Sequence, residues 1–133
     1  MGNGITSIAA GTFYDCAALE SIVIPDGVTA IGAEAFFGCG NLESVEIPNS
    51  VTSIDDCAFE WCAALTSIHI PESVTSIGTL AFYGCENLAS ATFGSPSGWI
   101  VDGTDLAPSE LSEPAKAAEY LRATYADYYW KRS

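Results

Sequence analysis

The chain contains a sequence that repeats every 23 residues, and this repeat constrains the fold more than any other feature. Three full copies run over residues 19–41, 42–64 and 65–87, a partial copy precedes them over residues 5–18, and a weaker strand-like segment follows over residues 88–93. Several positions hold the same residue in successive copies: Leu19, Leu42, Leu65 and Leu88; Ile8, Ile31, Ile54 and Ile77; Phe13, Phe36, Phe59 and Phe82. Such a period indicates a repeat protein in which each copy forms one unit and contacts its neighbours.

Each copy predicts one coil of a solenoid with two extended sides. The pattern L-x-x-I-x-I alternates as a short strand with branched residues pointing inward, and a proline such as Pro25 ends it. The following V-T-x-I predicts a second, shorter extended segment, and the remainder, for example Gly32 to Cys39, suits one helical or 3-10 turn. The period lies within the leucine-rich-repeat range of roughly 20 to 29 residues. We therefore predict a repeat solenoid of about four 23-residue coils with parallel strands.

The consensus L-x-S-[IV]-x-I-P-x-x-V-T-x-I-x-x-x-A-F-x-x-C resembles the leucine-rich repeats of the BspA-like family, which occur in bacterial surface proteins. The resemblance covers about two thirds of the chain, with modest departures at Asp55, Cys57 and Ala91. It implies a right-handed β/α superhelix in a cell-surface or secreted protein that binds host or matrix proteins.

Residues 95–133 differ in composition from the repeats. All four bases lie in the last 18 residues: Lys116, Arg122, Lys131 and Arg132. Apolar residues recur at intervals of three and four after Pro114, which predicts an amphipathic helix over about residues 113–131 with Ser112 as its N-cap. We expect this helix to cap the coil stack, so that the array (residues 1–94) and the cap form one domain. The alternative is a helix that binds a partner or a lipid surface.

The charge balance argues against two classes of partner. Seventeen acids against four bases give a net charge of −13, and residues 1–94 carry eleven of these acids and no Lys or Arg, which makes the array alone −11. Such a charge repels phosphate backbones and anionic lipids, so we expect no binding to nucleic acid or to a membrane surface. Because no apolar stretch reaches about 18 residues, we expect no membrane insertion, and the sequence shows no signal peptide.

The five cysteines predict neither disulfides nor a metal site. Four of them occupy one repeat position: Cys16, Cys39, Cys62 and Cys85. A ladder holds such side chains parallel, so we expect buried thiols that pack against their neighbours instead of pairing. Cys57, Cys62 and His69 form a candidate soft-metal set, but no fourth ligand is spaced to complete it.

The sequence also predicts no catalytic centre. His69 is the only imidazole and lies at an outward strand position, with no serine or cysteine nucleophile spaced to pair with it. Asp55 and Asp56 lack the alternating oxygen ligands and the glycine turn of a calcium loop. We therefore expect a noncatalytic module without a cofactor.

Outward strand positions differ between copies and form the candidate protein-binding surface, here called the strand face. Its residues are Glu20, Val23, Glu43, Glu46, Thr66, His69 and Thr92, with Ala89 at the equivalent position of the last strand. A second candidate is Trp61, which replaces Gly38 and Gly84 on the outer wall. We expect Trp61 to be partly buried against Phe37 and Tyr83.

The leading hypothesis is a noncatalytic, adhesin-like protein-interaction module of a larger bacterial cell-surface or secreted protein. The alternative is a structural spacer that binds no specific ligand. Met1 to Gly4 lack the strand pattern that opens later copies, so we expect the first coil to be uncovered on one side at Ile5, Ile8 and Phe13. An uncovered coil with free strand groups favours self-association through the N-terminal coil.

Overall fold

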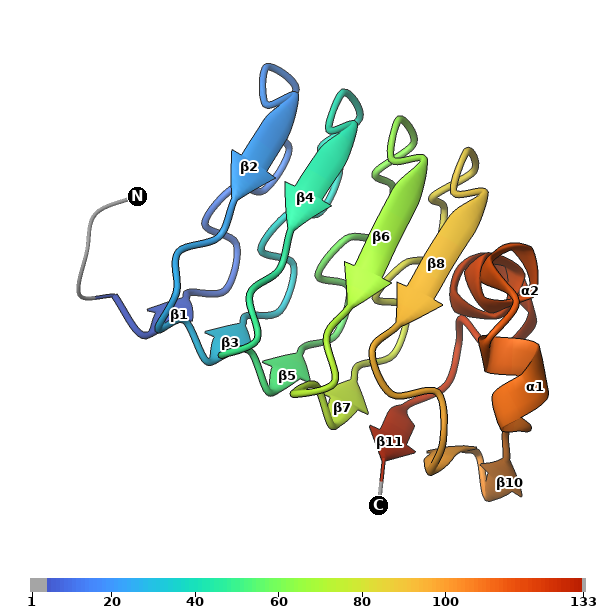
Figure 1. Cartoon of the computed structure of the whole chain (residues 1–133). Helices are drawn as coiled ribbons and strands as arrows, with labels where there is room; N and C mark the ends of the chain where they lie inside the picture. The colour runs from blue at the N-terminus through green and yellow to red at the C-terminus, as the bar shows by residue number, and fades with distance from the viewer. Residues whose placement is uncertain (1–4, 133) are drawn as a thin grey trace.

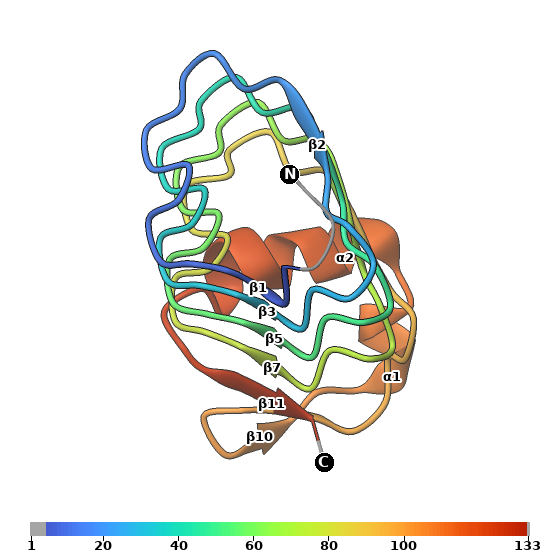
Figure 2. The same ribbon diagram turned by 90° about the vertical axis from the view of Figure 1, so that its left-hand side faces the viewer.

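The computed structural model describes residues 5–132 of the chain. Four coils stack side by side from the N-terminal end, and the C-terminal segment closes the other end of the stack (Figure 1). Viewed along the stack, the coils superpose on one another as an elongated ring (Figure 2). The predicted solenoid with parallel strands in 23-residue register is therefore confirmed.

One wall of the solenoid carries the longer strands, one from each coil. They are β2 (Ser21–Val23), β4 (Ser44–Glu46), β6 (Ser67–Ile70) and β8 (Ser90–Phe93). Equivalent residues lie opposite one another, with Ser21 beside Ser44 and Ser67 beside Ser90. The ladder is interrupted once, because β2 pairs with β4 and β6 pairs with β8 in two separate sheets.

A second wall carries shorter strands that pair continuously. They are β1 (Ser7–Ile8), β3 (Ala30–Ile31), β5 (Ser53–Ile54) and β7 (Ser76–Ile77). The threonines just before the last three of these strands reinforce the register, because each hydroxyl donates to the threonine carbonyl of the preceding coil. These hydrogen bonds run from Thr29 to Thr6, from Thr52 to Thr29 and from Thr75 to Thr52.

The third wall consists of consecutive turns, where the sequence predicted one helical or 3-10 turn per coil. Two kinds of hydrogen bond alternate along it: Phe37 N donates to Glu34 O in the same coil (3.2 Å), and Phe36 N donates to Ala58 O in the next coil (2.8 Å). Glu34 and, four residues later, Gly38 have φ values of 57° and 74°. A left-handed residue at this spacing ends each turn before a helix can continue, so the wall bonds to the neighbouring coils instead.

Inside the walls, the repeated apolar residues stack into ladders. The rings of Phe36, Phe59 and Phe82 are nearly parallel, with successive centroids 5.1 and 5.2 Å apart, and none is more than 1% exposed. Burying a phenylalanine side chain contributes about 1.5–3 kcal/mol. The ladders therefore supply the main stabilising contribution of the array.

We predict that Phe59→Ala will lower the free energy of unfolding by about 3–5 kcal/mol, because it opens a hole between two stacked rings. Urea denaturation followed by circular dichroism measures the change. Phe37→Ala is the matched control, since Phe37 is only half-buried on the turn wall and its loss should cost less. A cost below about 1 kcal/mol for Phe59→Ala would contradict the role of the ladder.

The C-terminal segment covers the last coil. Its elements are β9 (Trp99–Val101), β10 (Thr104–Asp105), α1 (Pro108–Leu111), α2 (Pro114–Glu119), the π-helical turn η1 (Tyr120–Thr124) and β11 (Trp130–Arg132). Helix α2 packs against β8 at the end of the stack (Figure 1). No helix within residues 5–132 is long and apolar enough to span a membrane.

The helix predicted over residues 113–131 is too long. Its helical part ends at Thr124, and β11 instead pairs antiparallel with both β7 and β9. Tertiary packing explains the difference, because Trp130 is 1% exposed and lies against Phe93 and Trp99, with ring centroids 5.9 and 6.0 Å away. The strand also covers the edge of β7, which would otherwise present unpaired backbone groups.

The predicted N-cap is also wrong. Glu113 occupies the N-cap position of α2 and makes no side-chain capping hydrogen bond. The hydroxyl of Ser112 donates to Pro108 O (2.7 Å) and so bonds within the preceding short helix α1. Serine favours such local bonds to the backbone, and α1 offers one that the sequence pattern did not reveal.

Arg132 fastens the end of the segment to the last coil. Its guanidinium donates from Nη1 to Glu72 O (3.0 Å), from Nη2 to Ser95 Oγ (2.6 Å) and from Nε to Ser97 O (3.1 Å). Hydrogen bonds from a charged donor are stronger than neutral ones. The terminal strand is therefore held by both its ladder and its side chain.

Candidate functional site

The strand face lies on the wall of the longer strands, and all seven predicted residues are exposed on it: Glu20, Val23, Glu43, Glu46, Thr66, His69 and Thr92. Strand alternation is the cause for Val23, Glu46, His69 and Thr92, whereas Glu20, Glu43 and Thr66 lie just before β2, β4 and β6. In β6, Ser67 and His69 are exposed while Ile68 and Ile70 are buried. Since the coils are in register, Val23 lies beside Glu46, and His69 beside Thr92.

A shallow depression of about 340 Å³ crosses the strand face over β4, β6 and β8. Glu46, His69 and Thr92 line it together with serines of the same strands. His69 Nδ1 lies 2.7 Å from Thr92 Oγ1, which fixes the orientation of the imidazole. The depression spans the break between the two sheets, so it offers polar side chains where the backbone ladder is interrupted.

A second depression, of about 530 Å³, lies where the turn wall leads into the strands. Glu20 and Glu43 line it together with Asn41 and Asn87, which the sequence reasoning did not single out. Each asparagine donates from Nδ2 to an alanine carbonyl of the preceding coil, at 2.6 Å for Asn41 and 2.8 Å for Asn87. Asparagine recurs at this repeat position in the second and fourth coils, and this recurrence is the sequence signal that could have indicated the two residues.

The face is acidic. Three of its seven residues are carboxylates, and residues 1–94 contain no lysine or arginine to balance them. All three side chains are exposed. Such a surface attracts a basic partner and repels an acidic one.

The structure does not bring the candidate soft-metal set together. Cys57 is half-buried on the turn wall and Cys62 is buried in the core, whereas His69 is exposed on the strand face. The thiols of Cys39, Cys62 and Cys85 instead donate to phenylalanine carbonyls of the preceding coil, at 3.0, 3.2 and 3.1 Å. The expected packing role is confirmed for these three, while Cys16 in the first coil is only half-buried.

We predict that a soluble thiol reagent at pH 8 will label the native protein slowly. Burial raises the pKa of Cys39 to about 11, and burial followed by the neighbouring Glu60 raises the pKa of Cys57 to about 12. The reactive thiolate is therefore suppressed, whereas all five thiols should react after denaturation. Rapid native labelling of three or more cysteines would contradict this.

The same pKa values fix the sign of a pH effect on stability. The unfolded chain loses its thiol protons near pH 9, whereas the folded chain keeps that of Cys39 up to about pH 11. The free energy of unfolding should therefore decrease as the pH rises from 9 to 11. Replacing Cys39 with alanine should reduce this slope in a denaturant series.

Trp61 is partly buried, as predicted. Its side chain is 43% exposed and meets Tyr83 edge to face, with centroids 5.3 Å apart. Contact with Tyr83 is thus confirmed. The ring of Phe37, the other expected neighbour, stacks on Tyr14 at 4.9 Å.

Parallel strands in register, a repeat of 23 residues and inward leucine, isoleucine and phenylalanine ladders define a leucine-rich-repeat solenoid. The family described as BspA type leucine rich repeat region matches residues 2–100 in six copies. The chain belongs to this family. Repeats of this kind are generally noncatalytic modules for protein interaction. No curated protein matches the chain in sequence.

Solved structures of bacterial leucine-rich-repeat proteins resemble the chain. A leucine rich cell surface protein from Faecalibacterium prausnitzii A2-165 is 43% identical, with a TM-score of 0.66 over 69% of this chain and 24% of that chain. A leucine-rich repeat protein from Bacteroides capillosus ATCC 29799 is 26% identical, with a TM-score of 0.58 over 67% and 63%. The T. pallidum leucine rich repeat protein is 28% identical, with a TM-score of 0.55 over 72% of this chain and 56% of that chain. The chain thus spans less than two thirds of each of these proteins.

Proposed function

We propose that the chain is an adhesin-like protein-interaction module of a larger bacterial cell-surface or secreted protein, and that the strand face binds a host or matrix protein. One observation carries the proposal: four consecutive coils expose a variable, acidic set of side chains on one wall. A similar solved structure is a leucine rich cell surface protein, which supports a surface or secreted location. The chain covers only 24% of that protein, in keeping with a module of a longer chain.

The alternative function is a structural spacer. Serine occupies the same outward position in four strands, at Ser21, Ser44, Ser67 and Ser90. Such uniform small polar residues keep the strand surface hydrophilic, but they give a partner no large side chain to bind. The two functions differ in whether a change on the strand face alters binding.

We predict that Glu46→Lys will weaken retention of the protein on an immobilised extracellular-matrix extract, because it reverses a charge in the depression of the strand face. Biolayer interferometry at two salt concentrations measures the retention. The expected loss is roughly fivefold or more, and the wild-type signal should decrease as salt rises.

Glu34→Lys is the matched control, since it makes the same charge change at an exposed position of the turn wall. It should bind as the wild type does. Equal losses for both variants would mean that net charge alone is recognised. Absence of any retained wild-type protein would favour the spacer.

We also propose self-association through the N-terminal coil. Phe13 is half-buried, whereas its equivalents in the next three coils are buried, and β1 and β2 each pair on one side only among the described residues. The pattern noted for Met1 to Gly4 lies outside the described residues. Ile8 is only 2% exposed, so the expectation that it is uncovered is wrong, whereas Ile5 and Phe13 are half-buried. These partly exposed side chains and the strand edges favour pairing with a second copy.

Light scattering over a concentration series tests this proposal. The average mass should rise with protein concentration, and Ile22→Glu should keep the protein monomeric by placing a charge on the uncovered face. Val23→Glu is the control, because Val23 points outward from the same strand. A strict monomer at all concentrations would overturn the proposal.

A further inference from the structure

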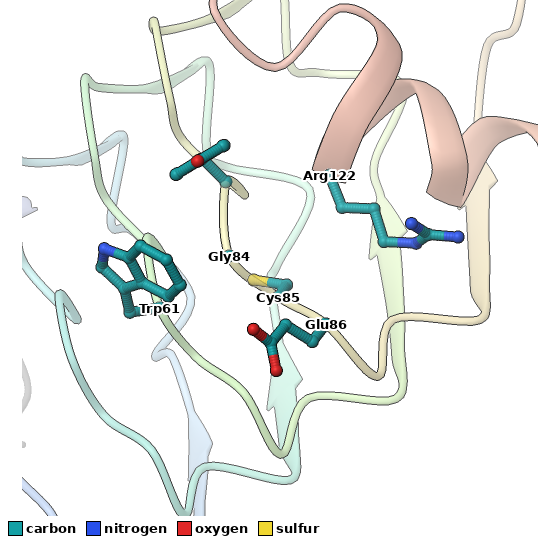
Figure 3. A pocket seen from close by; sticks show the side chains of 6 residues that line it. Trp61, Gly84, Cys85, Glu86 and Arg122 are labelled. Carbon is teal, nitrogen blue, oxygen red and sulfur yellow. The ribbon is translucent and has the colours of Figure 1, made fainter.

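A pocket of about 200 Å³ lies on the turn wall beside the C-terminal segment and shares no lining residue with the strand face. Its lining comes from coils three and four and from η1: Trp61, Tyr83, Gly84, Cys85, Glu86 and Arg122. Figure 3 shows the indole of Trp61 on one side of the pocket and Arg122 entering from the helical segment on the other. The proposed protein-binding function of the strand face does not use this pocket.

Trp61 is held in a backbone conformation that bulky residues rarely adopt. Its φ is 63°, and the two neighbouring coils have glycine at the same position, Gly38 at 74° and Gly84 at 80°. Left-handed conformation is strained for a residue that carries a β-carbon. The same position is left-handed in every coil, with Asp15 at 56° in the first, and Glu34, Cys57 and Leu80 are left-handed elsewhere on the turn wall. The conformation therefore belongs to the turn wall, and coil three differs in carrying a large aromatic ring there.

Gly84 provides the seat for this indole. A β-carbon at Gly84 would come within 2.6 Å of Trp61 Cδ2, so the ring lies directly over the glycine backbone. Trp61 is nevertheless 43% exposed, whereas Trp99 and Trp130 are each 1% exposed. The ring is thus fixed in place and still accessible from the pocket.

The polar groups around the indole favour a cation. The Glu86 carboxylate is directed toward the Trp61 side of the pocket, whereas the guanidinium of Arg122 points away from it (Figure 3). Arg122 donates its Nε hydrogen to Leu88 O (3.1 Å), which holds the charged group in that orientation. The pocket is therefore lined by the aliphatic stem of Arg122, by the aromatic rings of Trp61 and Tyr83, and by the negatively charged Glu86.

We propose that this pocket binds a basic side chain, arginine or lysine, presented by a protein partner. A cation over an indole face is attracted by the ring quadrupole, and tryptophan is the strongest of the aromatic residues in this role. Glu86 supplies an ion-pair partner next to the ring. The net charge of −11 over residues 1–94 raises the local concentration of basic ligands around the whole array.

Titration with N-acetyl-arginine-N-methylamide, followed by NMR of the tryptophan indole N–H groups, tests the proposal. The Trp61 signal should shift and saturate. Trp99 and Trp130 serve as internal references, because their indole N–H groups are bonded to Ser95 O and Tyr125 O. The isosteric neutral citrulline derivative should cause no saturable shift, and neither should N-acetyl-glutamate.

Two variants complete the test. Glu86→Gln should weaken the arginine probe about two- to fivefold, as expected for the loss of one partly exposed charge. Trp61→Gly restores the residue of the neighbouring coils, so it should keep its melting temperature within about 5 °C and abolish the probe-induced shift of the Gly84 amide. The proposal fails if the citrulline or glutamate probe binds as well as the arginine probe, or if binding survives in the folded Trp61→Gly protein.

Discussion

The structure depends on the 23-residue register that places each side chain against its own copy in the next coil. Backbone hydrogen bonds hold this register on different walls, for example from Thr52 N to Thr29 O and from Phe36 N to Ala58 O (both 2.8 Å). A shift of one residue would remove Phe59 from its ladder and turn the strand side chains to the opposite face. Because the ladders exist only between coils, stability belongs to pairs of neighbours and not to any single coil.

The coils were predictable because the repeats can be compared with one another within the chain. A position that stays apolar in every copy points inward. The C-terminal segment has no second copy. Its helical periodicity held as far as Thr124, but the capture of Trp130 between Phe93 and Trp99 joins residues that sequence periodicity cannot relate. The left-handed backbone conformation of Glu34 was equally unpredictable, since glycine is the residue that indicates such a conformation in a sequence.

The two candidate surfaces differ in the same way. Alternation along each strand explains the exposure of Val23, Glu46, His69 and Thr92, so the sequence was enough to place these residues, while Glu20, Glu43 and Thr66 are exposed just before the strands. The pocket beside Trp61 needs the stem of Arg122 from η1 as its second side, and no pattern in the repeats reveals where that segment docks. The sequence nevertheless carried one signal, the replacement of a repeated glycine by tryptophan. Its meaning appears only once Gly84 is seen beneath the ring.

Register also governs charge. Stacking in 23-residue steps places a repeated residue beside its own copy in the next coil, and this would hold for repeated acids as it does for the phenylalanines. The repeats avoid this consequence: between residues 5 and 94, Glu20 and Glu43 are the only acids that are neighbours in one column. Glu43 N donates to Glu20 O at 2.8 Å, so the two residues are adjacent in space just before β2 and β4, and like charges so placed repel one another. This pair belongs to the strand face and lines its larger depression. A repulsion avoided elsewhere is retained where a basic partner would relieve it, which supports the proposal that the strand face binds a protein.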